Sequence, residues 1–134
     1  MKQVLSTTLA ILGMWAVVFF STDSVAQEGC TGGAMHVIHV SEGASGGPEL
    51  SYRDGPADAV HVCNGDQIQW VLKGSDREFL IEFLSGAPFA GGESRGSSQG
   101  VVLETVDAEP GEYDYGINFV GDEPMDPTII VDPS

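Results

Sequence analysis

The segment Val62-Cys63-Asn64-Gly65-Asp66-Gln67-Ile68-Gln69-Trp70 joins two predicted β-strands through a tight turn. Asn64 and Gly65 are the residue types that supply the positive φ values of such a turn. After the turn, polar and apolar residues alternate with a period of two. The isoleucine and the tryptophan therefore face one side of the strand and the two glutamines face the other. This pattern predicts a strand that buries one of its faces.

Short strands with similar patterns are predicted along most of the chain, with almost no helical periodicity. They cover residues 34–40, 49–53, 59–63, 67–73, 78–84, 101–106, 112–119 and 128–131. The Gly- and Ser-rich residues 85–100 are expected to form a long connection that crosses from one sheet to the other. Seven or eight short strands within about 100 residues, separated by Gly and Pro, indicate an all-β sandwich.

Residues 1–26 have the three-part order of a secretory signal peptide. Lys2 supplies the positive charge, an apolar stretch follows, and Ser24-Val25-Ala26 forms the predicted cleavage site. The uninterrupted apolar core, Leu9 to Phe20, is shorter than the roughly 20 residues that a membrane-spanning helix needs. We therefore predict cleavage, export to the periplasm or outside the cell, and no membrane insertion after cleavage.

The remaining residues, 27–134, are predicted to form one domain with a single core. They carry 4 basic and 19 acidic side chains, a net charge of −15. That charge repels nucleic acids and anionic lipid surfaces, so neither is an expected partner. A solvated acidic surface is the simplest interpretation, and a cationic partner is the alternative.

The two cysteines, Cys30 and Cys63, are expected to form a disulfide, because an even pair in an exported protein is most simply a bridge. The closed loop would hold about 34 residues, which the chain-entropy model values at roughly 3–4 kcal/mol. For a domain of this size, that is a large share of the total stability.

The segment 62–70 resembles the V-x-x-G-D-x-V-x-W/F turn and strand of the cupredoxins, the family of plastocyanin and azurin. Pro110-Gly111-Glu112-Tyr113-Asp114-Tyr115 resembles the P-G-x-Y-x-Y/F segment that leads to the cupredoxin copper loop. The resemblance covers most of residues 34–132 and implies a Greek-key sandwich of two sheets. It also implies that the first strand runs parallel to the strand beginning at Asp66, which would bring Cys30 and Cys63 within bridging reach.

A blue-copper site needs two imidazoles, one thiolate and a weak axial thioether. At the positions that match the family's equatorial ligands, this chain has Phe79, Ile117 and Val120. Met125 matches the axial position in spacing. Since all three equatorial ligands are missing, the resemblance does not extend to type 1 electron transfer. We predict no bound metal and no other cofactor.

Three histidines, His36, His39 and His61, leave a non-standard copper site as an alternative. His36 and His39 are three residues apart in one strand, so they point to opposite faces. A neighbouring strand could still bring one of them near His61, with Met35 as a further ligand. The simpler interpretation is that all three are partly buried polar residues with ordinary hydrogen bonds.

Asp122, Glu123 and Asp126 lie in one loop and suggest a weak Ca²⁺ site, although their spacing matches no EF-hand. A solvated loop is the favoured interpretation. The sequence supports no Ser/His/Asp or Cys/His nucleophile. We therefore predict no catalytic residue and no enzymatic activity.

These observations favour an exported, copper-free, cupredoxin-like binding or structural module with an unknown protein or small-molecule partner. The alternative is a periplasmic copper-binding or electron-transfer protein that uses non-standard His and Met ligands. A secreted hydrolase is the weakest of the three hypotheses.

Overall fold

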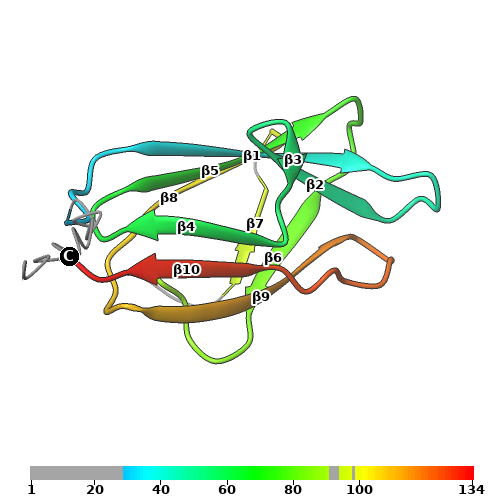
Figure 1. Ribbon diagram of the computed structural model, residues 1–134. Helices are drawn as coiled ribbons and strands as arrows, with labels where there is room; N and C mark the ends of the chain where they lie inside the picture. Colours follow the sequence, from blue (N-terminus) through cyan, green and yellow to red (C-terminus); the bar gives the residue numbers. More distant parts are fainter. Residues whose placement is uncertain (1–28, 91–93, 98) are drawn as a thin grey trace, which may run out of the picture.

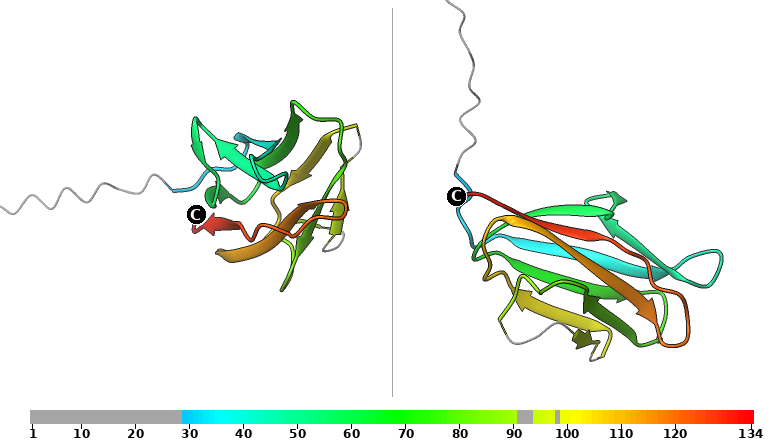
Figure 2. Two further views of the ribbon diagram at one scale, coloured as in Figure 1. Left: turned by 90° about the vertical axis from the view of Figure 1, so that its right-hand side faces the viewer. Right: turned by 90° about the horizontal axis from the view of Figure 1, so that it is seen from below.

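The computed structural model describes residues 29–90, 94–97 and 99–134. The predicted signal peptide, residues 1–26, lies outside this part of the chain. The described residues form ten β-strands in two five-stranded sheets. The two sheets pack face to face as a sandwich (Figures 1 and 2). The predicted all-β sandwich is therefore confirmed.

The first sheet, sheet A, has the strand order β3-β2-β1-β5-β8. Its strands are β1 (Met35–Glu42), β2 (Pro48–Tyr52), β3 (Gly55–Pro56), β5 (Gln67–Lys73) and β8 (Val101–Thr105). β1 and β5 are parallel, with Met35 opposite Gln67 and Ser41 opposite Lys73. The other pairs in this sheet are antiparallel. The parallel pair is the one that the cupredoxin resemblance implies.

The second sheet, sheet B, has the order β4-β10-β9-β6-β7. Its strands are β4 (Ala59–Cys63), β10 (Thr128–Asp132), β9 (Gly111–Phe119), β6 (Phe79–Phe83) and β7 (Ser94–Gly96). β4 and β10 are parallel, and the other pairs are antiparallel. Because parallel neighbours cannot be joined by a hairpin, the chain crosses repeatedly between the sheets, as a Greek-key sandwich requires.

Residues 85–100 were predicted to be a connection without a strand. This prediction is wrong at Ser94–Gly96, which form the short strand β7. β7 pairs with β6, so that Arg95 lies opposite Ile81, and the chain then crosses to β8 in sheet A as expected. Small residues around Arg95 give no alternating pattern, so this strand depends on backbone pairing alone. Arg95 also pairs with Glu104 of β8 and thereby links the two sheets at this edge.

Aromatic side chains fill one part of the core between the sheets. Trp70 of β5 and Tyr115 of β9 are fully buried, and the indole Nε1–H donates to the Tyr115 hydroxyl at 3.2 Å. Their rings meet edge to face, with centroids 5.8 Å apart. Burial raises the pKa of Tyr115, against a smaller opposite effect of the hydrogen bond from Trp70. The alternating residues of β5 and β9 therefore face the core as predicted.

The turn between β4 and β5 joins the two sheets at the end of the sandwich near Cys63. The Asp66 N–H donates to the Cys63 carbonyl at 3.0 Å. Of the two residues predicted to have positive φ, only Gly65 does, at 90°. This geometry is that of a type II turn, which needs a positive φ only at its third residue.

Gly32 lies directly against this turn. A Cβ at Gly32 would overlap the carbonyl oxygen of Asn64 and crowd the Cα of Gly65. The Gly33 N–H donates to the Gly65 carbonyl at 3.2 Å. The close approach of two backbones explains why this position requires glycine.

We predict that Gly32→Ala lowers the free energy of unfolding by about 2 kcal/mol, the usual cost of overpacking a tight contact. Urea unfolding of the purified protein measures this difference. Gly47→Ala is the matched control, because a Cβ at Gly47 meets no atom within 4 Å and its φ is not positive. Equal stabilities of the two variants would contradict the close approach.

Candidate functional site

The four positions that match cupredoxin copper ligands lie together at one end of the sandwich. Phe79 and Ile117 are buried in the core. Met125 exchanges backbone hydrogen bonds with Ile117, at 2.9 and 3.0 Å, and packs against the core. Val120 is 73% exposed just beyond β9. We refer to Phe79, Ile117, Val120 and Met125 as the ligand-position cluster.

The chemistry of this cluster does not fit a copper ion. Phe79, Ile117 and Val120 carry no nitrogen, oxygen or sulfur atom in their side chains. Met125 offers one thioether, which is the weakest of the four ligands in a type 1 site. Phe79 is also fixed in place, because its N–H donates to Ser97 Oγ at 3.1 Å and its carbonyl accepts from the Ser97 N–H at 2.9 Å.

Arg77 covers the same end of the sandwich. Its guanidinium carbon lies 4.5 Å from the centroid of the Phe119 ring. Its Nη2 donates to Asp122 Oδ2 at 2.6 Å, and its Nη1 donates to the Gly46 carbonyl at 3.0 Å and to Glu42 Oε1 at 3.4 Å. One side chain therefore connects the β1–β2 loop, the β5–β6 connection and the β9–β10 loop.

The pKa of Arg77 reflects its pairing with Asp122. The hydrogen bond to Asp122 is the main cause that raises the pKa of Arg77, against a smaller opposing effect of desolvation. A guanidinium is charged throughout the ordinary pH range in any case, so the raised pKa reflects the pairing with Asp122 and not a change of charge state. The favoured interpretation of this segment as a solvated loop did not anticipate the ion pair between Asp122 and Arg77.

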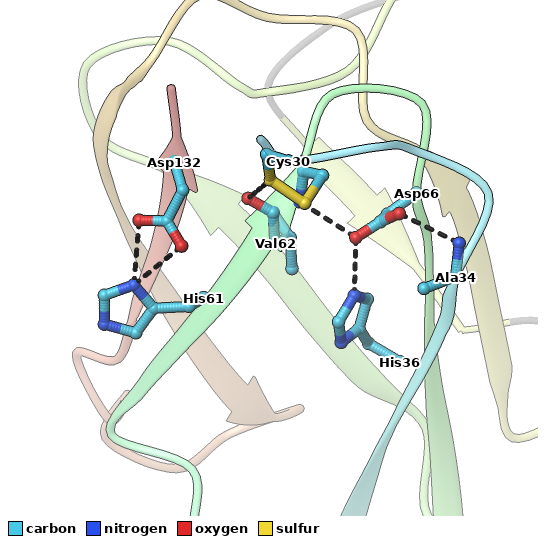
Figure 3. Close-up of a disulfide and its surroundings, with 8 residues drawn as sticks. Cys30, Ala34, His36, His61, Val62, Asp66 and Asp132 are labelled. Carbon is cyan, nitrogen blue, oxygen red and sulfur yellow. Dashed lines mark hydrogen bonds and ion pairs between the residues drawn. A yellow bond between two sulfur atoms is a disulfide. The ribbon is translucent and has the colours of Figure 1, made fainter. Parts of the chain in front are cut away.

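The predicted disulfide is present at the opposite end of the sandwich (Figure 3). The Cα atoms of Cys30 and Cys63 are 5.3 Å apart, within the ordinary range for a bridge. The bond attaches the segment before β1, in sheet A, to the end of β4, in sheet B. It therefore closes one end of the sandwich covalently.

Asp66 lies beside the disulfide with a fully used carboxylate (Figure 3). Its Oδ2 accepts hydrogen bonds from the Cys63 N–H at 2.8 Å and from His36 Nε2 at 2.7 Å. Its Oδ1 accepts from the Ala34 N–H at 2.9 Å. His36 Nδ1 is 2.7 Å from the Tyr52 hydroxyl. These five residues form a connected group that we call the Asp66 network.

Ionisation of Asp66 is favoured although the residue is buried. Burial is the largest single influence and by itself raises the pKa of the carboxyl. The hydrogen bonds from Cys63, His36 and Ala34 together outweigh it and hold the pKa of Asp66 below its ordinary value. An ionised carboxylate is an acceptor only, and here every group around it is a donor. The network is therefore satisfied and has no free nucleophile.

The three histidines do not come together. His36 and His39 point to opposite faces of β1, as predicted, and His36 is buried whereas His39 is half-buried. His61 lies on β4 in the other sheet, where its Nδ1 is 3.0 Å from Asp132 Oδ1 (Figure 3). Both ring nitrogens of His36 already have protein partners. The suggested approach of a neighbouring strand is wrong, because β1 and β4 belong to different sheets.

Other metal and membrane features can be judged for the part of the chain that the structure describes. No group of three or more His, Cys, Asp or Glu residues there is arranged to hold a metal ion. A search of the same residues for a helix long and apolar enough to cross a membrane finds none.

Sequence reasoning missed Arg77 and the role of Asp66. Arg77 is one of few basic residues in a very acidic chain, which is a signal that it has acidic partners. Asp66 was part of the quoted turn, but the pairing with His36 spans 30 residues and leaves no local pattern. Tyr52 was predicted to lie in a strand, and its contact with His36 was not predicted.

Comparisons with known proteins give structural neighbours alone. No protein-family model and no curated protein matches the sequence. One similar solved structure is a proline-to-glycine mutant of amicyanin in its reduced Cu(I) form at pH 4, with 20% identity, coverage of 76% of this chain and 85% of that chain, and a TM-score of 0.46. Another is a methionine-to-alanine mutant of amicyanin, Cu(I). It has 19% identity and a TM-score of 0.45, and the match covers 72% of this chain and 82% of that chain.

We predict that Arg77→Ala lowers the midpoint of thermal unfolding by a few degrees and speeds hydrogen exchange in residues 43–47 and 121–125. The reason is the loss of contacts from one side chain to three loops. Arg77→Lys should recover only part of the loss, because an ammonium group cannot reproduce the planar fork of the guanidinium. Arg53→Ala is the control, since the Arg53 guanidinium stacks over Tyr52 at 5.0 Å without a carboxylate partner among the described residues. Loop exchange that is the same in Arg77→Ala and Arg53→Ala would contradict this role.

Acid should weaken the protein through Asp66. Because the folded-state pKa lies below the ordinary value of 3.8, the ionised carboxylate stabilises the fold at neutral pH. That contribution is lost as the pH falls below about 4 and through the folded-state pKa. We predict that Asp66→Asn lowers the free energy of unfolding at pH 7 by about 3 kcal/mol and reduces the acid dependence.

Urea unfolding at several pH values measures both effects. Asp54→Asn is the matched control, because Asp54 is exposed and its φ of 63° is one that asparagine tolerates. The same acid dependence in Asp66→Asn and in the unmutated protein would rule out the Asp66 carboxylate as its source.

Proposed function

We propose that the chain is an exported, copper-free, cupredoxin-like module with a binding or structural role. The observation that carries this proposal is the apolar content of the ligand-position cluster. Phe79 and Ile117 belong to the packed core, and placing donor atoms there would require rebuilding it. The cupredoxin-like architecture is therefore kept without the chemistry that copper needs.

The cluster also lies near a cation, because Phe119, which the Arg77 guanidinium contacts, is paired with Phe79 across β6 and β9. Arg77 lies over the Phe119 ring, and a permanent positive charge next to a metal position disfavours a cation. The Arg77 hydrogen bonds occupy the carboxylates of Asp122 and Glu42. Both features favour a rigid end over an open metal site.

A relocated copper site is the weaker alternative. His36 is bonded at both ring nitrogens, and His61 lies in the other sheet with Asp132. Assembling these histidines around one ion would break the Asp66 network, which holds β1 to the β4–β5 turn. No observation favours this alternative over the copper-free module.

Export fits the chemistry of the chain. The disulfide suits an oxidising compartment, and the segment 1–26 has the composition of a signal peptide. A net charge of −15 supports solubility and disfavours nucleic acid as a partner. The proposal includes no enzymatic activity, because every side chain of the Asp66 network is used in holding the fold.

We predict that the protein purified after export binds neither Cu(II) nor Cu(I) stoichiometrically and shows no thiolate-to-copper absorption band. Calorimetric titration and visible spectroscopy with each copper ion measure this. Tight binding at one ion per chain would overturn the copper-free proposal. Loss of that binding in His36→Ala, His39→Ala or His61→Ala would then establish the alternative with non-standard ligands.

A further inference from the structure

The turn between β2 and β3 has an unusual combination of backbone and side chains. Tyr52 pairs with Gly55 across the turn, so only Arg53 and Asp54 lie between the two strands. Both have a positive φ, 49° for Arg53 and 63° for Asp54, as a type I′ turn requires. Such turns usually hold glycine, asparagine or aspartate, so arginine is the uncommon residue here. This turn therefore carries a large cationic side chain where the backbone favours a small one.

The side chain of Arg53 stacks on a ring that is itself fixed. Its guanidinium carbon lies 5.0 Å from the centroid of the Tyr52 ring. The Tyr52 hydroxyl is 2.7 Å from His36 Nδ1, and His36 Nε2 is 2.7 Å from Asp66 Oδ2. The Asp66 network therefore holds the ring on which the guanidinium lies. Stacking uses the flat face of a guanidinium and leaves its in-plane N–H groups available to an acceptor.

Arg53 and Asp54 line a cavity of about 340 Å³ on the outward-facing side of β1. Met35, Val37 and His39, which alternate with the buried residues of β1, also line it. Its volume lies within the range of roughly 300–1,000 Å³ that small-molecule sites occupy. Apolar side chains together with a few polar or charged groups are the usual lining of such a site. The cavity therefore has the size and composition to hold a small molecule.

The two charged groups of the turn are unpaired. Among the described residues, neither Arg53 nor Asp54 has an ion-pair partner, and the two form no ion pair with each other. The other two arginines of the described chain, Arg77 and Arg95, are both paired with carboxylates. In a chain with 20 acidic residues, an unpaired guanidinium beside an unpaired carboxylate in one cavity is a distinctive arrangement.

We propose that this cavity binds a small zwitterion, an α-amino acid with an apolar side chain. The ligand carboxylate accepts hydrogen bonds from the Arg53 guanidinium, and the ligand ammonium group donates to the Asp54 carboxylate. Met35 and Val37 contact the apolar side chain of the ligand. A simple anion is repelled by the charge of −15 and by Asp54, and a simple cation meets Arg53. A zwitterion has no net charge and matches both groups.

This inference names a ligand class for the proposed binding role and rests on that role. The copper-free character of the chain and this site can fail separately. Copper titration decides the first, and amino-acid titration decides the second. A purely structural module would bind neither copper nor an amino acid.

Nuclear magnetic resonance titration of the protein purified after export, with L-leucine as the probe, tests the site. We expect one leucine to bind per chain, with chemical-shift changes centred on residues 35–39 and 51–54. Glycine, deaminated leucine and decarboxylated leucine should each bind at least about tenfold more weakly, because each lacks one of the three contacts. No change at these residues up to about 10 mM leucine, or equal binding of leucine and its analogues, overturns the proposal.

Variants of the turn test the two charged contacts. Arg53→Gln and Asp54→Asn should each weaken leucine binding by about tenfold, because each removes one charge-assisted contact. Both residues are exposed, and urea unfolding checks that the variants remain folded. Lys73→Gln and Asp107→Asn are the matched controls, since these exposed charges lie outside the cavity. Affinity that is unchanged in the turn variants, or that falls equally in the controls, overturns the proposal.

Discussion

The carboxylate of Asp66 is the interaction on which the rest of the sandwich depends. It accepts hydrogen bonds from Ala34 before β1, from Cys63 at the end of β4 and from His36 within β1. These groups belong to both sheets and to the turn between them, so one buried charge fixes the place where the chain changes sheets. The parallel pairing of β1 with β5 needs this fixed point, because no hairpin connects the two strands. The disulfide adds a covalent link at the same place.

The opposite end of the sandwich is held by different forces. There Phe79, Ile117 and Phe119 are packed in the core, and Arg77 closes the loops above them. In the cupredoxin resemblance this end is where a metal would hold the same loops together. Here apolar packing and one guanidinium connect the loops, through the hydrogen bonds of Arg77 to Asp122, Gly46 and Glu42. The three loops are therefore connected by protein groups at the end of the sandwich where the resemblance places the copper ligands.

Sequence patterns revealed the features that have a short period. Alternation in the β5 and β9 segments predicted which residues face the core, and the Gly-Asp turn with the later Pro-Gly-x-Tyr segment suggested the strand arrangement. The pairing of Cys30 with Cys63 was also predicted, because the chain offers only one pair. Contacts that cross many residues were not predictable: His36 with Asp66, and Arg77 with Asp122, join segments with no shared pattern. β7 was missed because its pairing depends on backbone groups and no side-chain alternation marks it.

The distribution of charge follows from how few cations the chain has. Arg77 and Arg95 are both paired with carboxylates that hold the ends or edges of the sheets together. Those pairs leave Lys73 as the one cation on the outward-facing side of β1, β5 and β8, strands that the structure describes completely. The paired arginines therefore hold separate segments of the fold together, and the remaining acidic groups keep the net charge of the chain strongly negative.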